Sequence, residues 1–322
     1  MPLPGSVDEL LADAHVVAVP MRVPFRGVLV REALLLQGPF GWGEFSPFVE
    51  YDDAEAARWL AGAVEAAFTG WSAPLRSSIP VNATVPAVAA DAVVPVLQRF
   101  PGCTTAKVKV AERGQSLEDD VARVRAVREV LGPQGRVRVD ANGGWSVDAA
   151  RRALEALAVF DLEYAEQPCG TVEELVALRE AGCPVLVAAD ESVRKAEDPL
   201  RVARLGAADV VVLKAAPMGG VAPALQVAAD CGLPVVVSSA LDTSVGIAAG
   251  LALAAALPDL PYACGLATTG LMAADVAALQ VVDGHLPVGA VGPDPSRLRG
   301  LAATADRARW WHERLRRCAD LL

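Results

Sequence analysis

Lysine is scarce in this sequence. Of the 29 lysine and arginine residues only four are lysines, namely Lys107, Lys109, Lys195 and Lys214. Arginine stays protonated in proteins and does not accept a proton, whereas a lysine amine can be neutral. The preference for arginine therefore excludes most basic side chains as general bases and singles out the four positions that keep a titratable amine.

Basic charge is also in short supply overall. The formal net charge is -10, which argues against binding of nucleic acid or an anionic membrane surface by bulk electrostatics. The N-terminal stretch has no basic and apolar leader pattern, and the most apolar segment, 243–258, is shorter than a membrane span. No CxxC occurs, so we expect free thiols in a reducing cytoplasm at Cys103, Cys169, Cys183, Cys231, Cys264 and Cys318. The sequence leaves the oligomeric state open.

A glycine-rich loop after the first predicted strand is missing too, which argues against a dinucleotide-binding sheet. From about residue 79, short β-branched runs alternate with helical patterns. Eight runs are predicted strands, at 79–85, 106–110, 136–142, 161–168, 184–192, 209–215, 233–240 and 261–266. Helix signals lie between them, such as the serine cap at Ser116 and the capping box of Thr171 and Glu174. This alternation predicts an α/β fold with a closed parallel barrel.

The first 78 residues have a different pattern. HVVAVPM, VLVREALLLQG and FGWGEF are predicted antiparallel strands, with a turn in QGPFG, and EAARWLAGAVEAAF follows as a helix. The tail from Pro295 is predicted to be a closing helix in which Trp310 and Trp311 pack against a neighbour. We therefore expect a small α+β domain over 1–78, closed by the C-terminal segment 290–322, and a barrel domain over 79–289.

Polar residues stand near the carboxyl ends of consecutive predicted strands, where barrel enzymes place their chemistry. Lys107 and Lys109 share one face of a strand because they are two residues apart. Three acids and a lysine follow at intervals of 26, 24 and 24 residues: Asp140, Glu166, Asp190 and Lys214. A lone acid at a strand end is more often a helix cap, but three acids and three lysines in phase on five strands are not explained that way. Lys195, in the charged segment VRKAED, is expected to be solvated.

Three convergent carboxylates predict a divalent cation. Asp140, Glu166 and Asp190 offer oxygen ligands only, which suit Mg²⁺, with Mn²⁺ as a possible substitute. The three histidines lie outside these strands, which argues against a zinc or non-haem iron site.

The two neighbouring amines predict an acid–base device. A lysine beside a second lysine and a divalent cation has a lowered pKa and can serve as a base. A bound cation can hold a substrate carboxylate and stabilise the enediolate formed when the α-proton leaves. We therefore predict that Lys109 transfers protons, that Lys107 tunes it, and that Lys214 flanks the substrate on the other side.

These motifs resemble those of the enolase superfamily, in particular its muconate-lactonizing subgroup. They follow the order of that family: GWGEFSP at 41–47, KVK at 107–109, DAN at 140–142, EQP at 166–168, DES at 190–192 and the lone Lys214. The resemblance covers nearly the whole chain. It implies a modified TIM barrel of the (β/α)7β type with an α+β capping domain.

Within this subgroup the sequence most resembles the o-succinylbenzoate synthase family. The likeness lies in the Arg-Val-Asp run at 138–140, in SSALDTSVG at 238–246, and in the short capping domain. It implies Mg²⁺-dependent dehydration of 2-succinyl-6-hydroxy-2,4-cyclohexadiene-1-carboxylate to o-succinylbenzoate, a hydro-lyase step of menaquinone biosynthesis. The resemblance further implies that the succinyl pocket is lined by Ser238, Ser239 and Gly265.

Other positions keep two interpretations. Arg138 either meets a substrate carboxylate, directly or through water, or forms an ion pair inside the barrel. Asn142 is either part of the metal shell or a turn residue. Phe25 and Arg26, in the stretch 20–27 that resembles a mobile capping loop, either contact the substrate or pack rigidly.

Competing functions remain open at the level of the sequence. The two-lysine arrangement also supports an N-succinylamino acid racemase, a dipeptide epimerase or a cycloisomerase, although the region CGLATTGLM has no acids to hold a dipeptide amine. A Schiff-base aldolase on Lys214 would leave the three acids unexplained. A non-catalytic scaffold would usually have lost a lysine or an acid, and all six are present.

Overall fold

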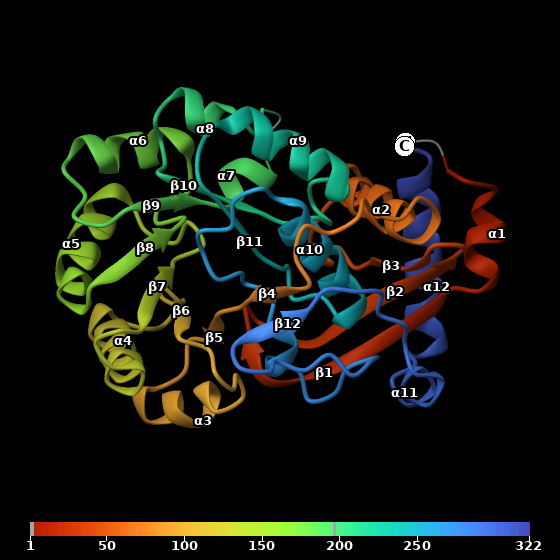
Figure 1. The fold of residues 1–322 in the computed structure, drawn as a ribbon, viewed down its shortest axis with the longest axis horizontal. Helices are drawn as coiled ribbons and strands as arrows, with labels where there is room; N and C mark the ends of the chain where they lie inside the picture. Colours follow the sequence, from red (N-terminus) through yellow and green to blue (C-terminus); the bar gives the residue numbers. More distant parts are fainter. Residues whose placement is uncertain (1–2, 196–197) are drawn as a thin grey trace.

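The largest sheet is a parallel barrel wall built from the middle of the chain (Figure 1). The computed structural model describes residues 3–195 and 198–322. Within them, seven strands lie in the order β11-β10-β9-β8-β7-β6-β5, and every neighbouring pair is parallel. The strands are β5 Ala83–Val85, β6 Thr105–Lys109, β7 Arg136–Asp140, β8 Leu162–Glu166, β9 Val187–Ala189, β10 Val210–Leu213 and β11 Val235–Val237.

The eighth predicted strand is reduced to two bridges that close the barrel. Cys264 pairs with Val81 and Gly265 pairs with Ser238, both in parallel. The segment 261–266 contains a proline, which lacks an N–H, and a glycine, which weakens a strand, so no regular strand forms. The predicted run 79–85 is likewise divided, because β4 (Ser78–Pro80) leaves the barrel and pairs antiparallel with β12 (His285–Pro287).

Helices cover the outer face of this wall (Figure 1). They are α3 Val93–Leu97, α4 Leu117–Leu131, α5 Val147–Leu157, α6 Val172–Glu180, α7 Glu191–Arg194, α8 Arg201–Arg204, α9 Val221–Cys231 and α10 Ser244–Ala256, with short 3₁₀ turns at Ala90–Ala92, Ala158–Phe160 and Thr268–Leu271. The predicted cap at Ser116 is confirmed, since its side chain accepts from the backbone N–H of Asp119. The predicted capping box of Thr171 and Glu174 is confirmed as well.

The N-terminal residues form an antiparallel sheet that covers one side of the barrel. Its order is β1-β2-β3, with β1 His15–Phe25, β2 Val28–Gly38 and β3 Gly41–Phe45. Four helices accompany it, namely α1 Val7–Ala12, α2 Asp53–Phe68, α11 Pro295–Gly300 and α12 Ala305–Ala319. Helix α12 packs on α2 and β1, so we infer that the C-terminal segment belongs to this cap. No helix in the described part of the chain is long and apolar enough to cross a membrane.

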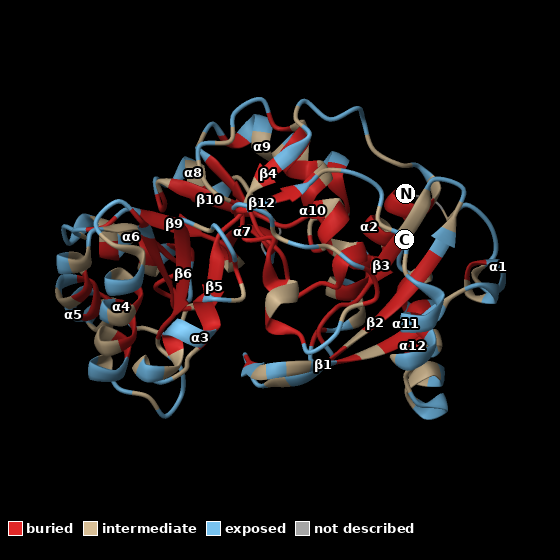
Figure 2. Ribbon diagram, turned by 60° about the horizontal axis from the view of Figure 1, so that its bottom comes forward, coloured by how far each residue is buried: buried red, intermediate tan, exposed pale blue. Residues whose placement is uncertain are grey.

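The buried side chains fill both the barrel and the cap (Figure 2). Strands of the barrel are buried over nearly their whole length, whereas the outer faces of the helices are exposed. In the cap, Trp59 and Trp311 are fully buried, and Trp311 meets the Phe45 ring edge-on at 5.7 Å. The sequence expectation that Trp311 packs against a neighbour is therefore confirmed.

A carboxylate of the cap holds the start of a barrel helix. Glu44, at the end of β3, is buried and accepts hydrogen bonds from the Thr243 hydroxyl at 2.5 Å and from the Gly246 N–H at 2.9 Å. Thr243 is the N-cap residue of α10, where a negative charge is favourable. Burial, and then the neighbouring Asp242 carboxylate, raise the pKa of Glu44 to about 7.

This raised pKa predicts how stability depends on pH. The folded-state pKa of Glu44 exceeds the ordinary value of 4.5, so the unfolded protein loses this proton at lower pH than the folded protein does. The free energy of unfolding therefore decreases as pH rises between the two pKa values, and the whole loss is reached above both. Glu44→Gln removes the ionisation and keeps the shape. The variant should therefore gain stability relative to wild type between about pH 5 and pH 8, measured by urea unfolding. The exposed Glu50→Gln serves as the control, and a Glu44→Gln difference that stays constant with pH would contradict the assignment.

Candidate active site

The predicted site residues gather at one mouth of the barrel. Lys109, Asp140 and Glu166 are the last residues of β6, β7 and β8, and they are paired in register across those strands. Asp190 directly follows β9 and Lys214 directly follows β10. The carboxyl ends of parallel strands lie at the same edge, so short spacing along the chain becomes proximity in space.

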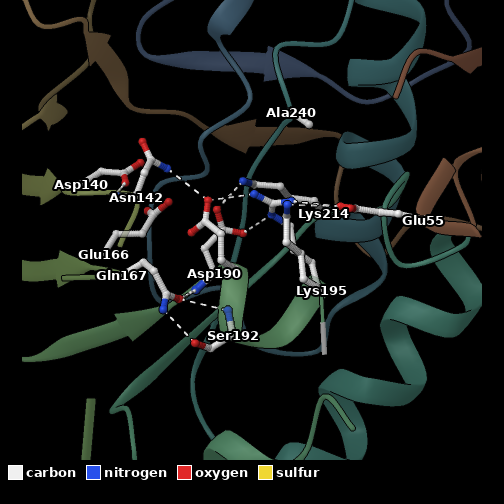
Figure 3. A network of polar contacts seen from close by, with 12 residues as sticks. Glu55, Asp140, Asn142, Glu166, Gln167, Asp190, Ser192, Lys195, Lys214 and Ala240 are labelled. Atoms are coloured by element: carbon white, nitrogen blue, oxygen red, sulfur yellow. Dashed lines mark hydrogen bonds and ion pairs between the residues drawn. The ribbon is translucent and has the colours of Figure 1, made fainter. Parts of the chain in front are cut away.

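Each carboxylate of the site is paired with a lysine amine. Lys107 Nζ lies 2.6 Å from Glu166 Oε1 and 2.9 Å from Asp140 Oδ2. Lys109 Nζ lies 2.5 Å from the same Asp140 oxygen. Lys214 Nζ lies 2.5 Å from Asp190 Oδ2. Figure 3 shows the three acids projecting from neighbouring strands of the wall, with Lys214 facing Asp190.

The two lysines of β6 differ in their proton affinity. Burial and the nearby Lys107 ammonium lower the pKa of Lys109, although Asp140 opposes the shift. Burial also lowers the pKa of Lys107, but its ion pairs with Asp140 and Glu166 outweigh burial and raise it overall. Of the two amines, Lys109 is therefore the one that more readily gives up its proton.

The three carboxyl groups of the site also differ in the direction of their pKa shifts. Burial disfavours charge on Asp140, yet Lys107 and Lys109 hold its pKa well below the usual range. Burial likewise opposes ionisation of Asp190, but Lys214 and Arg194 lower its pKa. Burial, and then the Asp140 carboxylate, raise the pKa of Glu166 to about 7, and the opposing effects of Lys107 and Lys214 do not offset them.

Polar neighbours fix the loops that carry these acids. Gln167 Oε1 accepts from the Asp190 N–H at 3.0 Å, and Gln167 Nε2 donates to Ser192 Oγ at 2.7 Å (Figure 3). Asn142 Oδ1 accepts from Lys109 Nζ at 2.6 Å. Gln167 and Asn142 have φ values of +40° and +47°, in the left-handed region where glutamine is uncommon and asparagine is tolerated. The Asn142 side chain thereby lines the cavity, whereas the Gln167 side chain holds the loop that carries Asp190.

A small cavity opens over the amines. The predicted residues that line it are Lys107, Lys109, Asp140, Lys214, Ser238, Ser239 and Gly265, with Asn142 beside them. The cap contributes Phe25, Arg26 and Phe48. The Lys109 amine lies 5.2 Å from the centre of the Phe25 ring, so the end of β1 covers Lys109. A Cβ on Gly265 would come 2.4 Å from Ser238 Oγ, which explains the glycine.

Arg138 is not brought to this cavity. Its side chain is buried in the barrel interior, where Nε lies 2.5 Å from Glu163 Oε2 and Nη1 donates to Asn82 Oδ1 at 3.2 Å. The guanidinium also lies 4.7 Å from the centre of the Tyr164 ring. This is the barrel-interior ion pair that the sequence left as the alternative, so direct contact with a substrate has no support from the position of Arg138.

Several residues of the site carried too weak a signal for the sequence analysis to single them out. Thr84 lines the cavity beside Lys107, its partner in register, and its buried hydroxyl has no hydrogen-bond partner among the described residues. The signal that could have indicated Thr84 is the two-residue periodicity of the predicted strand 79–85, in which alternate side chains share one face. Arg194 donates to Asp190 Oδ1 at 3.0 Å, a contact that the i, i+4 spacing in a short helix could have indicated. Lys195, expected to be solvated, is partly exposed and lies 3.6 Å from Glu55.

The donor set of this site suits a hard divalent cation. Asp140, Glu166 and Asp190 supply oxygen atoms only, and each is at most 1% exposed. In residues 3–195 and 198–322, however, no three acidic, histidine or cysteine side chains are arranged to hold a metal ion directly. Each of the three carboxylates is instead paired through one oxygen with a lysine ammonium.

Two family models match this chain. Residues 16–67 match the family described as "Enolase N-terminal domain-like", and residues 90–308 match "Enolase C-terminal domain-like". A muconate lactonizing enzyme from Pseudomonas fluorescens, solved with muconolactone, superimposes with a TM-score of 0.77 at 22% identity, covering 90% of this chain and 98% of that one. An N-succinyl Arg/Lys racemase from Bacillus cereus gives a TM-score of 0.73 at 18% identity, covering 90% and 97%. These identities show a shared fold alone.

Curated relatives match over nearly the whole chain. The o-succinylbenzoate synthase of Mycolicibacterium smegmatis is 60% identical over 319 residues, which is 98% of each chain. Those of Thermobifida fusca and Mycobacterium leprae are 59% and 58% identical, covering 91% and 98% of this chain and 92% and 94% of theirs.

The capped barrel and its lysine–carboxylate site define a member of the enolase superfamily, whose enzymes depend on a divalent metal. Within that class, the chain belongs to the o-succinylbenzoate synthase family, and the family resemblance expected from the motifs is confirmed. Members of this family are hydro-lyases.

Arg194 gives a test of the site that needs no substrate. Its guanidinium is 3% exposed and contacts Asp190, Glu191 at 2.8 Å and the Tyr51 hydroxyl at 3.2 Å. Removing one partner of a buried ion pair leaves an uncompensated charge and costs about 3–5 kcal/mol. Arg194→Met should therefore lower the free energy of unfolding by about 3 kcal/mol or more, measured by urea unfolding with EDTA present.

The control removes an arginine from an exposed ion pair. Arg309 pairs with Asp306 on the surface of α12, where such pairs contribute about 0–1 kcal/mol. Equal and small losses for Arg194→Met and Arg309→Met would contradict the role of Arg194 in holding Asp190.

Proposed function

We propose that this chain catalyses the Mg²⁺-dependent syn dehydration of 2-succinyl-6-hydroxy-2,4-cyclohexadiene-1-carboxylate to o-succinylbenzoate, within menaquinone biosynthesis. The observation that carries the proposal is identity of 56–60% to curated synthases over nearly the full chain. The presence of Lys109 and Lys214 in one cavity is consistent with it.

Lys109 is proposed to move the proton. Its neutral amine removes the proton on C1, the carbon that bears the carboxylate, and the electron pair left behind is first held in the enediolate. That electron pair then forms the new ring double bond as the C6–O bond breaks. The resulting Lys109 ammonium then donates its proton to the departing hydroxide on the same face, which gives water and an aromatic ring. The lowered pKa of Lys109 supports this role, because a base must be neutral to accept a proton.

Lys214 is proposed to stay charged and to face the substrate from the other side of the cavity. It extends from the end of β10, whereas Lys109 extends from β6, with three strands between them. An ammonium in this position stabilises the negative charge that develops on the substrate and can form a cation–π contact with the ring. Lys107 keeps a raised pKa and, by its charge, helps Lys109 to be neutral.

Asp140, Glu166 and Asp190 are proposed to hold the cation, with Asn142 beside them. When bound, Mg²⁺ supplies a positive charge for the substrate carboxylate and for the enediolate oxygens. The support is the oxygen-only donor set and its burial at the mouth of the barrel. Mn²⁺ accepts the same ligands and is expected to substitute.

The succinyl side chain is proposed to lie against Ser238, Ser239 and Gly265. All three line the cavity, and Ser239 Oγ donates to Gly265 O at 2.9 Å, which fixes its direction. Phe25 and Arg26 cover the opening from the cap. Arg138, predicted to bind substrate, is left out of this pocket, since its guanidinium is paired with Glu163 in the barrel interior.

We also propose that the enzyme acts in the cytoplasm on this small molecule. The six cysteines are free, and four of them are buried, as expected for thiols kept in a reducing compartment.

Replacing the base should abolish turnover. Lys109→Met removes the proton acceptor. General acid–base catalysis contributes about 10²–10⁴-fold, so kcat should fall by at least about 10²-fold. Lys195→Met is the matched control, because Lys195 lies outside the cavity, and it should keep wild-type kcat. The measurement is the optical change on aromatisation of the substrate with Mg²⁺ present.

A different outcome would redirect the assignment. If wild type leaves this substrate unchanged but exchanges the α-proton of N-succinylamino acids with deuterium, the chain is a racemase on the same two lysines. If Lys109→Met keeps wild-type kcat, the assignment of Lys109 as the base is wrong.

Removal of the cation should also stop the reaction. EDTA should reduce turnover to background, and added Mg²⁺ should restore it. Glu166→Gln keeps the size of the side chain but loses a charged ligand, so the Mg²⁺ concentration for half-maximal activity should rise at least about tenfold. The same variant titrated with Mg²⁺ by calorimetry, without substrate, should show weakened binding. Unchanged Mg²⁺ binding would exclude Glu166 as a ligand.

A further inference from the structure

An arginine of the cap lies behind two walls of the active-site cavity. The side chain of Arg31, on β2, is 3% exposed, and its guanidinium lies 4.6 Å from the centre of the Phe48 ring, which lines the cavity. On the barrel side, Arg31 Nε donates to Leu241 O at 3.0 Å and Nη2 lies 3.4 Å from Ala240 O. Ala240 and Leu241 line the same cavity. One side chain thus contacts both the cap wall and the barrel wall.

The barrel wall at this point is strained. Leu241 has a φ of +65°, in the left-handed region, where a Cβ approaches the following carbonyl oxygen too closely. A leucine persists in such a conformation only when the surrounding structure holds it there. The loop supplies one contact itself, since the Ala240 N–H donates to Asp242 Oδ2 at 3.1 Å. Arg31 supplies the contact to the Leu241 carbonyl from outside the loop.

The position of Arg31 is itself fixed by the cap. Its Nη2 donates to the Ser46 carbonyl and, at 3.0 Å, to Ser46 Oγ. Ser46 Oγ in turn donates to Glu44 Oε1 at 2.7 Å, and Glu44 holds Thr243, at the end of the same loop. The loop 238–243 is therefore held by the cap at its middle and at its end.

We propose that Arg31 is a positioning residue, which sets the shape of the cavity wall formed by 238–241 and so determines how well the carboxylate-bearing side chain of the substrate fits. The inference rests on the proposed function, because that function places Ser238 and Ser239 against the substrate. A guanidinium is required, because two of its nitrogens reach carbonyls on separate segments at once, which a single ammonium on a flexible stem does not do.

The experiment compares Arg31→Met and Arg31→Lys with a matched control. Arg128, on α4, also donates to several backbone carbonyls, including Phe160 O at 3.0 Å, but lies away from the cavity. Arg128→Met should therefore keep wild-type kcat and KM. Both Arg31 variants should raise KM about tenfold with kcat within about threefold of wild type, since substrate fit is lost while the lysines remain.

A second readout follows the loop without substrate. Hydrogen–deuterium exchange, resolved by mass spectrometry, should be faster in peptides covering 238–246 in both Arg31 variants and unchanged there in Arg128→Met. If Arg31→Lys instead restores wild-type KM and wild-type exchange, charge alone is sufficient and the proposal is wrong.

Loss of Arg31 leaves Glu44 and Asp242 with less positive charge nearby, so Arg31→Met is paired with a milder change. Ser46→Ala removes one partner of Arg31 and should produce the same two effects, each smaller. If both Arg31 variants fail to fold, Ser46→Ala decides the question. The proposal is overturned if KM and hydrogen–deuterium exchange in Ser46→Ala are both those of wild type. Absence of turnover in wild type would overturn the proposed function, whereas the exchange measurement would still decide whether Arg31 fixes the loop.

Discussion

Burial of three carboxylates and three amines at one end of a barrel is the constraint on which this structure depends. Buried charges are tolerated only when each has a partner, and here every acid of the site is within 3 Å of a lysine nitrogen. The same exclusion of water that makes the arrangement costly also separates the proton affinities of neighbouring groups. Lys109 becomes easier to deprotonate and Glu166 harder to ionise. Stability and chemistry are therefore set by one feature of the packing.

The cap is joined to the barrel by polar contacts as well as by apolar packing. Glu44 caps a barrel helix, Arg31 holds a barrel loop, and the Phe25 ring covers Lys109. The contacts of Glu44 and Arg31 lie just after β11, where, among the described residues, two bridges at Cys264 and Gly265 complete the barrel wall. Because this part of the wall has few backbone hydrogen bonds of its own, contacts from the cap hold its conformation.

Much of this could be predicted from the sequence because it follows from periodicity and spacing. The positions of Lys109, Asp140, Glu166 and the remaining strand-end residues repeat with the βα unit, and parallel strands bring such repeats to one edge. Contacts between distant segments have no such period. The pairing of Arg31 with Leu241 could not be read from local pattern, because it depends on how the cap meets the barrel. That of Arg138 with Glu163 depends on the register shift between β7 and β8. The segment 261–266, predicted as a strand, contributes bridges at Cys264 and Gly265 instead, because Pro261 lacks an N–H and Gly265 weakens regular pairing.

The place of Trp311 in the cap core has a consequence for synthesis of the chain. The strands that it covers are made first, and the helix that carries it is made last. At roughly 5–20 residues per second, the N-terminal sheet waits on the order of ten seconds or more for its final covering. During that interval α2 can already pack on β2 and β3, but the face that α12 covers lacks its native partner, so the core of the cap is completed only at the end of synthesis.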